Sequence, residues 1–183
     1  TALAGCPRPG FLDHRQLVVR DDVDIVLVSN PSSYHFEVTM AAIGAGKHVL
    51  VEKPMCYTPA EADEIAAAAD RAGVTVQVGY MRRYSPSFLA ACRAVGEMGD
   101  VRLARVHDVI GANAQIIEPT SRVARGDDIP DDVRRAAAEH DARATARAIG
   151  DVPPALSTAY HIMLGLSSHD LSAMREIIGM PHD

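Results

Sequence analysis

A lone lysine stands between an acid and a proline in Glu52-Lys53-Pro54, directly after the apolar run 48–51. The chain has 18 basic residues, of which only Lys47 and Lys53 are lysines. An ammonium group at the end of a strand is suited to polarising a hydroxyl or carbonyl oxygen. Spacing alone leaves two interpretations open, a catalytic group or a surface lysine in a turn.

Two histidines stand near other polar residues. His35 follows Asn30-Pro31, and His169 precedes Asp170 in a late helical pattern. Histidine side chains titrate nearest neutrality and often act as general acid or base. The alternatives are that His35 is an ordinary residue of a first helical turn and that His169 is a hydrogen-bonded interior histidine.

Apolar runs alternate with helical patterns over the first 80 residues. The predicted elements are strands 23–30, 48–51 and 74–80 and helices 35–45 and 58–72. The run 23–30 is typical of a strand buried on both faces, and Thr58 with Glu61 predicts a capping box. Strands that alternate with helices over short links predict a parallel sheet. Such sheets bind ligands at the carboxyl edge, where Asn30 and Lys53 fall.

The organisation changes after residue 80. We predict a helix at 86–98, a strand with one solvated face at 101–110, a charged helix at 133–149 and a less polar helix at 156–178. The last helix carries His169. The charged helix is most simply a solvated surface element.

The composition limits the function classes. The chain has 183 residues, 48% of them hydrophobic and 23% charged, as in a globular protein, and a net charge of -6. An acidic balance argues against a nucleic-acid or anionic-membrane partner. The three cysteines include no C-x-x-C pair and no metal-ligand pattern occurs, so we expect neither disulfides nor a metal. The absence of an apolar run of about 18 residues argues against a membrane span, and we expect a cytoplasmic location.

Four segments together resemble the glucose-fructose oxidoreductase, inositol dehydrogenase and MocA family. They are VDIVLVSNPSSYH, AAIGAGKHVLVEKPMCYTPAEADEI, AGVTVQVGYMRRY and LSSHDLSAMREIIG. The resemblance implies an α/β fold, with a partial doubly wound parallel sheet of Rossmann type over residues 1–81. Part of an α+β substrate domain with a mainly antiparallel sheet would follow over residues 82–183.

The resemblance also implies a function, an oxidoreductase that uses NAD or NADP and acts on a CH–OH group of a sugar, inositol or related polyol. It places Asn30, Pro31 and His35 along the cofactor, and Glu52, Lys53 and Pro54 beside its nicotinamide end. By the same resemblance, the Lys53-Pro54 peptide bond is expected to be cis. The full-length form is expected to be a homo-oligomer.

The resemblance assigns catalytic roles to two residues. His169 would accept the substrate hydroxyl proton while hydride leaves the same carbon, and Lys53 would stabilise the developing oxyanion. Arg82, Arg83 and Asp170 would bind the substrate.

Two departures from the family pattern affect this interpretation. Gly165 occupies the position where the family often carries an aspartate, one helical turn before the catalytic histidine. The sequence also has no G-x-G-x-x-G fingerprint and no acidic residue following it. We therefore expect a chain that is incomplete at both ends and inactive alone. Two alternatives stay open: a non-catalytic relative that serves as sensor or assembly subunit, and an enzyme that uses transient oxidation for elimination or hydrolysis.

Overall fold

The computed structural model describes residues 10–107, 117, 119–121 and 128–180. The chain divides into two compact units, Thr1–Gly79 and Tyr80–Asp183. The predicted domain boundary, after residue 81, lies close to this division. The assignment of a cofactor domain and a substrate domain stays a prediction.

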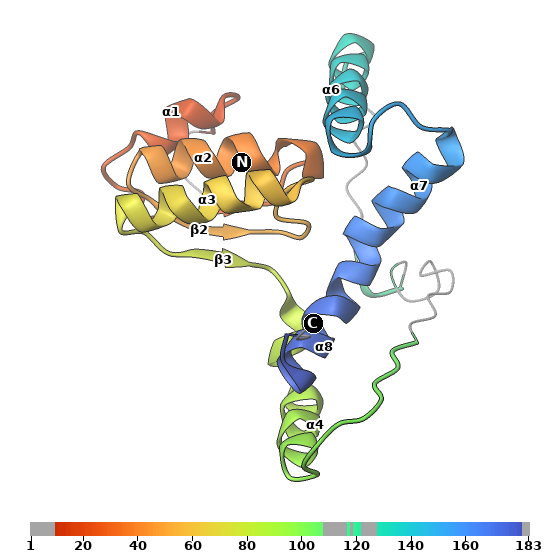
Figure 1. The fold of residues 1–183 in the computed structure, drawn as a ribbon. Coiled ribbons are helices and arrows are strands. Elements are labelled where there is room, and N and C mark those ends of the chain that lie inside the picture. Colours follow the sequence, from red (N-terminus) through yellow and green to blue (C-terminus); the bar gives the residue numbers. More distant parts are fainter. Residues whose placement is uncertain (1–9, 108–116, 118, 122–127, 181–183) are drawn as a thin grey trace. The chain divides into compact units, whose positions relative to one another are not determined.

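The first unit contains a parallel sheet of three strands in the order β1-β2-β3. Figure 1 labels two of them, β2 and β3. Its strands are β1 (Ile25–Val28), β2 (His48–Val51) and β3 (Val76–Val78). Val51 is in register with Val28 on one side and with Val78 on the other. The predicted parallel sheet of Rossmann type is confirmed, although β1 and β3 are shorter than their apolar runs.

Helices cover one face of this sheet. They include α2 (His35–Gly44) and α3 (Pro59–Ala72), which lie over the strands in Figure 1, while α1 (His14–Val18) and the short η2 (Ser32–Tyr34) complete the unit. The inward side chains of the strands are buried against α2 and α3. Burial therefore alternates along β1 and β2.

One expectation about β1 was wrong. The continuous apolar run predicted burial on both faces, but Ile25 is 65% exposed and Leu27 is 62% exposed. The reason is that, among the described residues, α2 and α3 bury only the opposite side chains of the strand.

Local signals set the ends of α3. The Thr58 hydroxyl oxygen accepts a hydrogen bond from the Glu61 backbone N–H at 3.1 Å, and the Glu61 carboxylate accepts one from the Thr58 N–H at 3.1 Å. Gly73 ends the helix with a φ of 65°, a conformation that glycine adopts without steric cost. The predicted capping box is confirmed.

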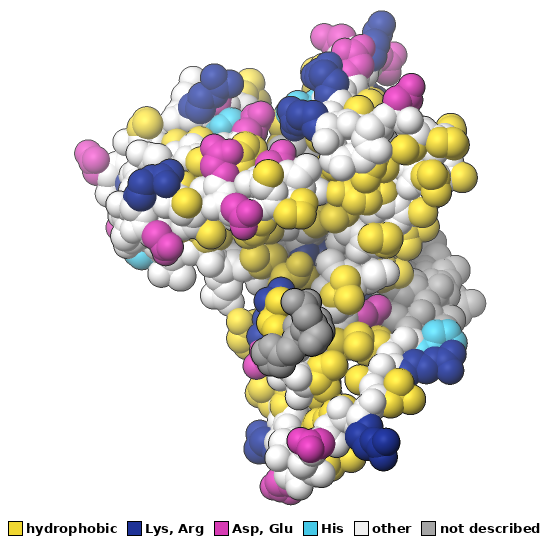
Figure 2. Space-filling view, viewed as in Figure 1, with side chains coloured by type: hydrophobic (Ala, Val, Ile, Leu, Met, Phe, Trp, Pro, Cys, Tyr) yellow, Lys and Arg dark blue, Asp and Glu magenta, His cyan; other side chains and the backbone are white. Residues whose placement is uncertain are grey.

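The regular elements described in the second unit are all helical. Its elements are η3 (Met81–Tyr84), α4 (Pro86–Gly96), α6 (Asp131–Ile149), α7 (Pro154–Ile162), the π-helical turn η4 (Met163–Ser167) and α8 (Ser168–Ile178). The single helix predicted for 156–178 is thus α7, η4 and α8 in succession. Apolar side chains gather on the exposed surface over α7, where Leu156 and Ile162 are exposed (Figure 2).

The strand predicted for residues 101–110 was wrong for 101–107, which form no strand. Residues 108–110 lie outside the described part of the chain. A strand requires backbone hydrogen bonds to a neighbour, and the described part of this unit supplies none. For the same reason, the expected antiparallel sheet is not seen among these residues.

Candidate functional site

Polar residues meet at one edge of the sheet in the first unit. Asn30 follows β1, Glu52 and Lys53 follow β2, and Gly79 follows β3. The Glu52 N–H donates to the Val28 carbonyl at 2.8 Å, and the Gly79 N–H donates to the Val51 carbonyl at 2.8 Å. These bonds continue the ladder past the strands and hold the three strand ends side by side.

His35 joins two of the loops at this edge. Its side chain is 1% exposed, with Nδ1 at 2.7 Å from the Pro54 carbonyl oxygen and Nε2 at 2.9 Å from the Asn30 carbonyl oxygen. Both ring nitrogens therefore face backbone of the candidate site. In this structure His35 holds the loop after β1 against the loop after β2, and its predicted contact with a cofactor stays a prediction.

Lys53 is half-buried at the same edge. Its backbone N–H lies 3.3 Å from a Glu52 carboxylate oxygen, and the Lys53-Pro54 bond is cis, as the family resemblance led us to expect. The other lysine has a different position, because Lys47 Nζ donates to the Arg20 carbonyl at 2.9 Å. Lys53 is thus the lysine of the strand-end edge.

Gly79 leaves room for the Glu52 carboxylate. A Cβ atom placed at Gly79 would lie 3.3 Å from Glu52 Cδ and from one of its carboxylate oxygens. A larger residue at this strand end would therefore displace the acid. Sequence reasoning did not single out Gly79, although a glycine at the end of a strand often marks a close approach of this kind.

The nearby thiol of Cys56 is kept protonated. Burial raises the pKa of Cys56 to about 11. The Glu61 carboxylate adds to this rise, and a hydrogen bond with the Thr58 backbone opposes it. Because the thiolate is the nucleophilic form, Cys56 does not provide a nucleophile beside the Lys53 loop at neutral pH.

In the second unit, His169 lies in the first turn of α8 and is buried. The Tyr80 ring meets it edge to face, with centroids 5.8 Å apart and planes at 80°. Gly165 lies in η4, one turn before His169, and a Cβ atom there would meet nothing within 4 Å. Single π-helical turns within helices are frequent near functional groups.

The arginines predicted to bind substrate pair with carboxylates of α8. Arg82 lies 3.8 Å from Asp170, and Arg83 pairs with Glu176. These contacts fasten η3 to α8 and compensate the charges of both arginines. Substrate binding by Arg82, Arg83 and Asp170 stays a prediction.

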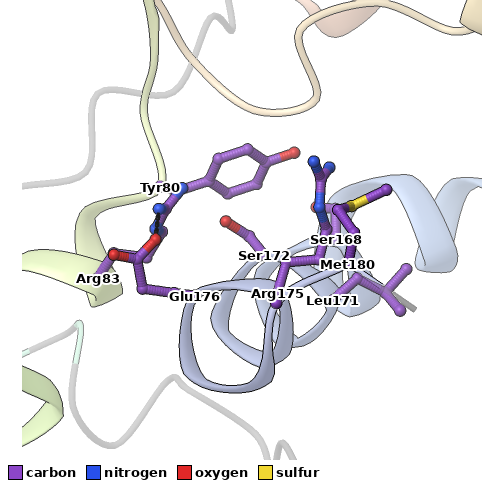
Figure 3. Close-up of a pocket in the computed structure, with 9 residues that line it drawn as sticks. Tyr80, Arg83, Ser168, Leu171, Ser172, Arg175, Glu176 and Met180 are labelled. Atoms are coloured by element: carbon purple, nitrogen blue, oxygen red, sulfur yellow. Dashed lines mark hydrogen bonds and ion pairs between the residues drawn. The ribbon is translucent and has the colours of Figure 1, made fainter. Parts of the chain in front are cut away.

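A cavity of about 570 Å³ lies between η3 and α8 (Figure 3). Its polar lining comes from Tyr80, Arg83, Ser168, Ser172, Arg175 and Glu176. Arg175 was missed by the sequence analysis. The available signal was its helical spacing from Ser168 and Ser172, which places the three side chains on one face of α8.

A parallel sheet with polar groups gathered at its carboxyl edge is the arrangement of nucleotide-binding α/β proteins. Residues 4–80 match the model of the oxidoreductase family with an NAD-binding Rossmann fold. The resemblance to this family predicted from the sequence is thereby confirmed for residues 4–80. The predicted cofactor class, NAD or NADP, agrees with the family's description.

Two curated relatives illustrate the match. The NADP(+)-dependent scyllo-inositol 2-dehydrogenase IolW of Bacillus subtilis is 43% identical over 41% of this chain and 21% of its own length. The inositol 2-dehydrogenase of Paracoccus denitrificans is 40% identical over 50% of this chain and 28% of its own length. The chain thus spans less than a third of either relative.

A solved structure resembles more of the chain. A probable dehydrogenase from Thermotoga maritima matches 93% of this chain and 41% of its own with a TM-score of 0.56, at 22% identity. At this identity the likeness concerns the fold alone.

In the described part of the chain, no helix has the length and apolar character needed to cross a membrane.

Proposed function

We propose that this chain carries the nicotinamide side of an oxidoreductase site that acts on a CH–OH group of a sugar, inositol or related polyol. The observation that carries the proposal is the shared strand-end edge of Asn30, Glu52 and Lys53, on a sheet that belongs to an NAD-binding oxidoreductase family. The two relatives named as inositol dehydrogenases support the substrate class.

The residues at the edge fit one end of a dinucleotide. Glu52 offers a carboxylate for ribose hydroxyls, and Lys53 offers an ammonium group for an oxygen at the reacting carbon. The sequence has no glycine-rich turn, which in this fold class receives the pyrophosphate at a helix N-terminus. The fit is therefore to the nicotinamide half.

Two residues would carry the proton and charge chemistry. His169 accepts the proton of the substrate hydroxyl, and Lys53 stabilises the negative charge that develops on that oxygen. A bound nicotinamide ring supplies the acceptor for the hydride. The family resemblance supports both assignments, and the burial of His169 against Tyr80 supports a fixed orientation for the imidazole.

The test is a binding titration of the 183-residue chain with reduced nicotinamide mononucleotide and with NADH, followed by NMR. We expect weak binding of both and less than a tenfold advantage for NADH, because the adenine half finds no phosphate site. Lys53→Gln should weaken binding about tenfold, whereas the control Lys47→Gln, at the chain's other lysine, should not.

Several outcomes would contradict the proposal. Equal effects of the two lysine substitutions would remove Lys53 from the site. Micromolar NADH binding with turnover of a polyol would show that the chain is a complete catalyst, contrary to the half-site interpretation.

Gly165 favours a second candidate function, a non-catalytic relative that acts as sensor or assembly subunit. The position lacks the carboxylate that the family often places one turn before the histidine. Because the site of a Cβ atom at Gly165 is open, Gly165→Asp is expected to fold. Polyol turnover by the protein with Gly165 would contradict the non-catalytic function, whereas turnover that requires Gly165→Asp would support it.

A further inference from the structure

Within the described part of the chain, the cavity between η3 and α8 carries a positive charge that no acid compensates. Of its two arginines, Arg83 pairs with Glu176, the acid of the cavity wall. Among the described residues, no ion pair or side-chain hydrogen bond engages the guanidinium of Arg175. With respect to residues 10–107 and 128–180, the cavity therefore presents one guanidinium whose side-chain donors are available.

The remaining polar groups of the cavity surround that guanidinium. Ser168, Ser172 and Arg175 lie on one face of α8, and Ser172 is 9% exposed. The Ser168 hydroxyl donates to the Leu164 carbonyl at 2.7 Å, which leaves its oxygen as an acceptor. In Figure 3 the Tyr80 ring stands across the cavity, with its hydroxyl toward the side where the Arg175 side chain rises.

The dimensions and composition suit a small ligand. A volume of about 570 Å³ lies within the ordinary range for small-molecule sites, roughly 300–1,000 Å³. The hydroxyl groups and the tyrosine match a polyhydroxylated ring, and the free guanidinium matches an acidic substituent on it.

The cavity adjoins the histidine to which we assign the proton transfer. The Tyr80 ring is a wall of the cavity and also contacts the His169 ring edge to face. Ser168 immediately precedes His169 on α8. The cavity and the imidazole thus share the Tyr80 ring as a neighbour.

We propose that this cavity is the subsite for the carboxylate of a sugar-acid substrate, with Arg175 pairing with the carboxylate. The inference rests on the proposed function and narrows its substrate class from sugars, inositols and related polyols to sugar acids. The guanidinium of Arg175 is a planar fork of N–H donors with one positive charge, and it matches a planar carboxylate with one negative charge. A phosphate dianion would keep part of its negative charge unpaired.

The experiment titrates the 15N-labelled 183-residue chain with D-galacturonate, D-galactose, acetate and inorganic phosphate. We expect galacturonate to bind at least tenfold more tightly than each of the other three and to shift the amide signals of α8 around Ser172 and Arg175. Arg175→Gln should remove this preference and leave the weak binding of galactose unchanged.

Two controls separate a site from an effect of charge or folding. Arg93→Gln removes an exposed charge from α4 in the same unit and lies outside the cavity lining, so it should leave galacturonate binding unchanged. Arg175→Lys keeps the charge without the planar fork and should retain only part of the preference. The comparison among ligands on the unsubstituted chain does not depend on whether any variant folds.

The inference is overturned if galacturonate binds no more tightly than galactose or acetate, if phosphate binds more tightly, or if Arg93→Gln and Arg175→Gln act alike. Its failure is distinct from failure of the proposed function. Loss of the nicotinamide mononucleotide response with an intact galacturonate response would leave a carboxylate site without the oxidoreductase assignment. The reverse result would retain the assignment and remove the acidic substrate.

Discussion

The two units of this chain bury their apolar side chains to very different extents. In the first unit, strand and helix residues form one buried cluster that includes Val28, Val51 and Ile65. In the second unit, the buried apolar residue among those described is Ala144, while Leu156, Met163 and Leu171 are more than half exposed. Both units have well-formed helices, but among the described residues only those of the first form a core that holds its helices together.

The difference shows that a sequence can form regular helices without also forming a buried core. Caps and helical spacing act within a few residues, and they form helices in both units. A core needs two apolar faces that meet, and the parallel sheet supplies the second face only in the first unit. Substitutions that act equally on local structure should therefore have unequal effects on stability.

The largest difference should come from truncating apolar side chains. Ile65→Ala, at a side chain that is 1% exposed, should cost about 2–5 kcal/mol of unfolding free energy, because it leaves a cavity in the core. Leu156→Ala, at a side chain that is 57% exposed, should change it by less than about 0.5 kcal/mol. Urea unfolding followed by circular dichroism measures both, and equal losses would contradict the comparison.

A second difference should appear between two histidines that hold elements together. His35→Ala removes a buried contact with the Pro54 carbonyl and a part-buried one with the Asn30 carbonyl, and should cost about 2 kcal/mol. His161 lies 3.2 Å from Asp141 Oδ2 and 2.9 Å from the Ser157 carbonyl oxygen. It is partly exposed, so water replaces these contacts and His161→Ala should cost under about 1 kcal/mol.

Hydrogen exchange shows which part of the first unit His35→Ala destabilises. His35→Ala should speed exchange in the loops after β1 and β2, where Lys53 lies, before it affects α3. If exchange in these loops stays unchanged while the whole unit loses stability, His35 is a core residue and does not position the candidate site.

The same contrast explains what the sequence could predict. The bounds of α3 and β2 followed from short-range signals, since the cap of Thr58 and the C-terminal Gly73 act on their immediate neighbours. The shared edge of Asn30 and Lys53 also followed, because parallel strands align their carboxyl ends. These features depend on periodicity and turn chemistry, which are properties of single segments.

Other features depend on pairs of distant residues and were not predicted. Such features are set by how elements are rotated against each other. They are the approach of Gly79 to Glu52, the pairing of Arg83 with Glu176 and the exposure of Arg175 in the cavity. The expected strand at 101–110 failed for a related reason. Alternation marks a segment that is able to pair, but a ladder forms only where a second strand is present.

The smallest difference between the units should come from the N-terminal caps of α3 and α4. The two caps have nearly the same local chemistry, so any difference in their effect reflects the surroundings of the helices. Thr58 Oγ1 accepts from the Glu61 N–H at 3.1 Å, and Ser85 Oγ accepts from the Phe88 N–H at 3.2 Å. Each substitution to alanine removes one cap, worth about 1 kcal/mol to its helix. The two helices differ in what holds them, since α3 contributes Ile65 to the core and α4 has no buried residue.

Thr58→Ala should therefore lower the unfolding free energy of the first unit by about 1 kcal/mol, because α3 and the sheet unfold together. Ser85→Ala should instead speed hydrogen exchange in the first turn of α4 while the urea midpoint stays constant, because that helix opens by itself. A shift of the urea midpoint by Ser85→Ala as large as that by Thr58→Ala would show that α4 shares a cooperative core. The two units would then differ in the exposure of their apolar side chains but not in how cooperatively they unfold.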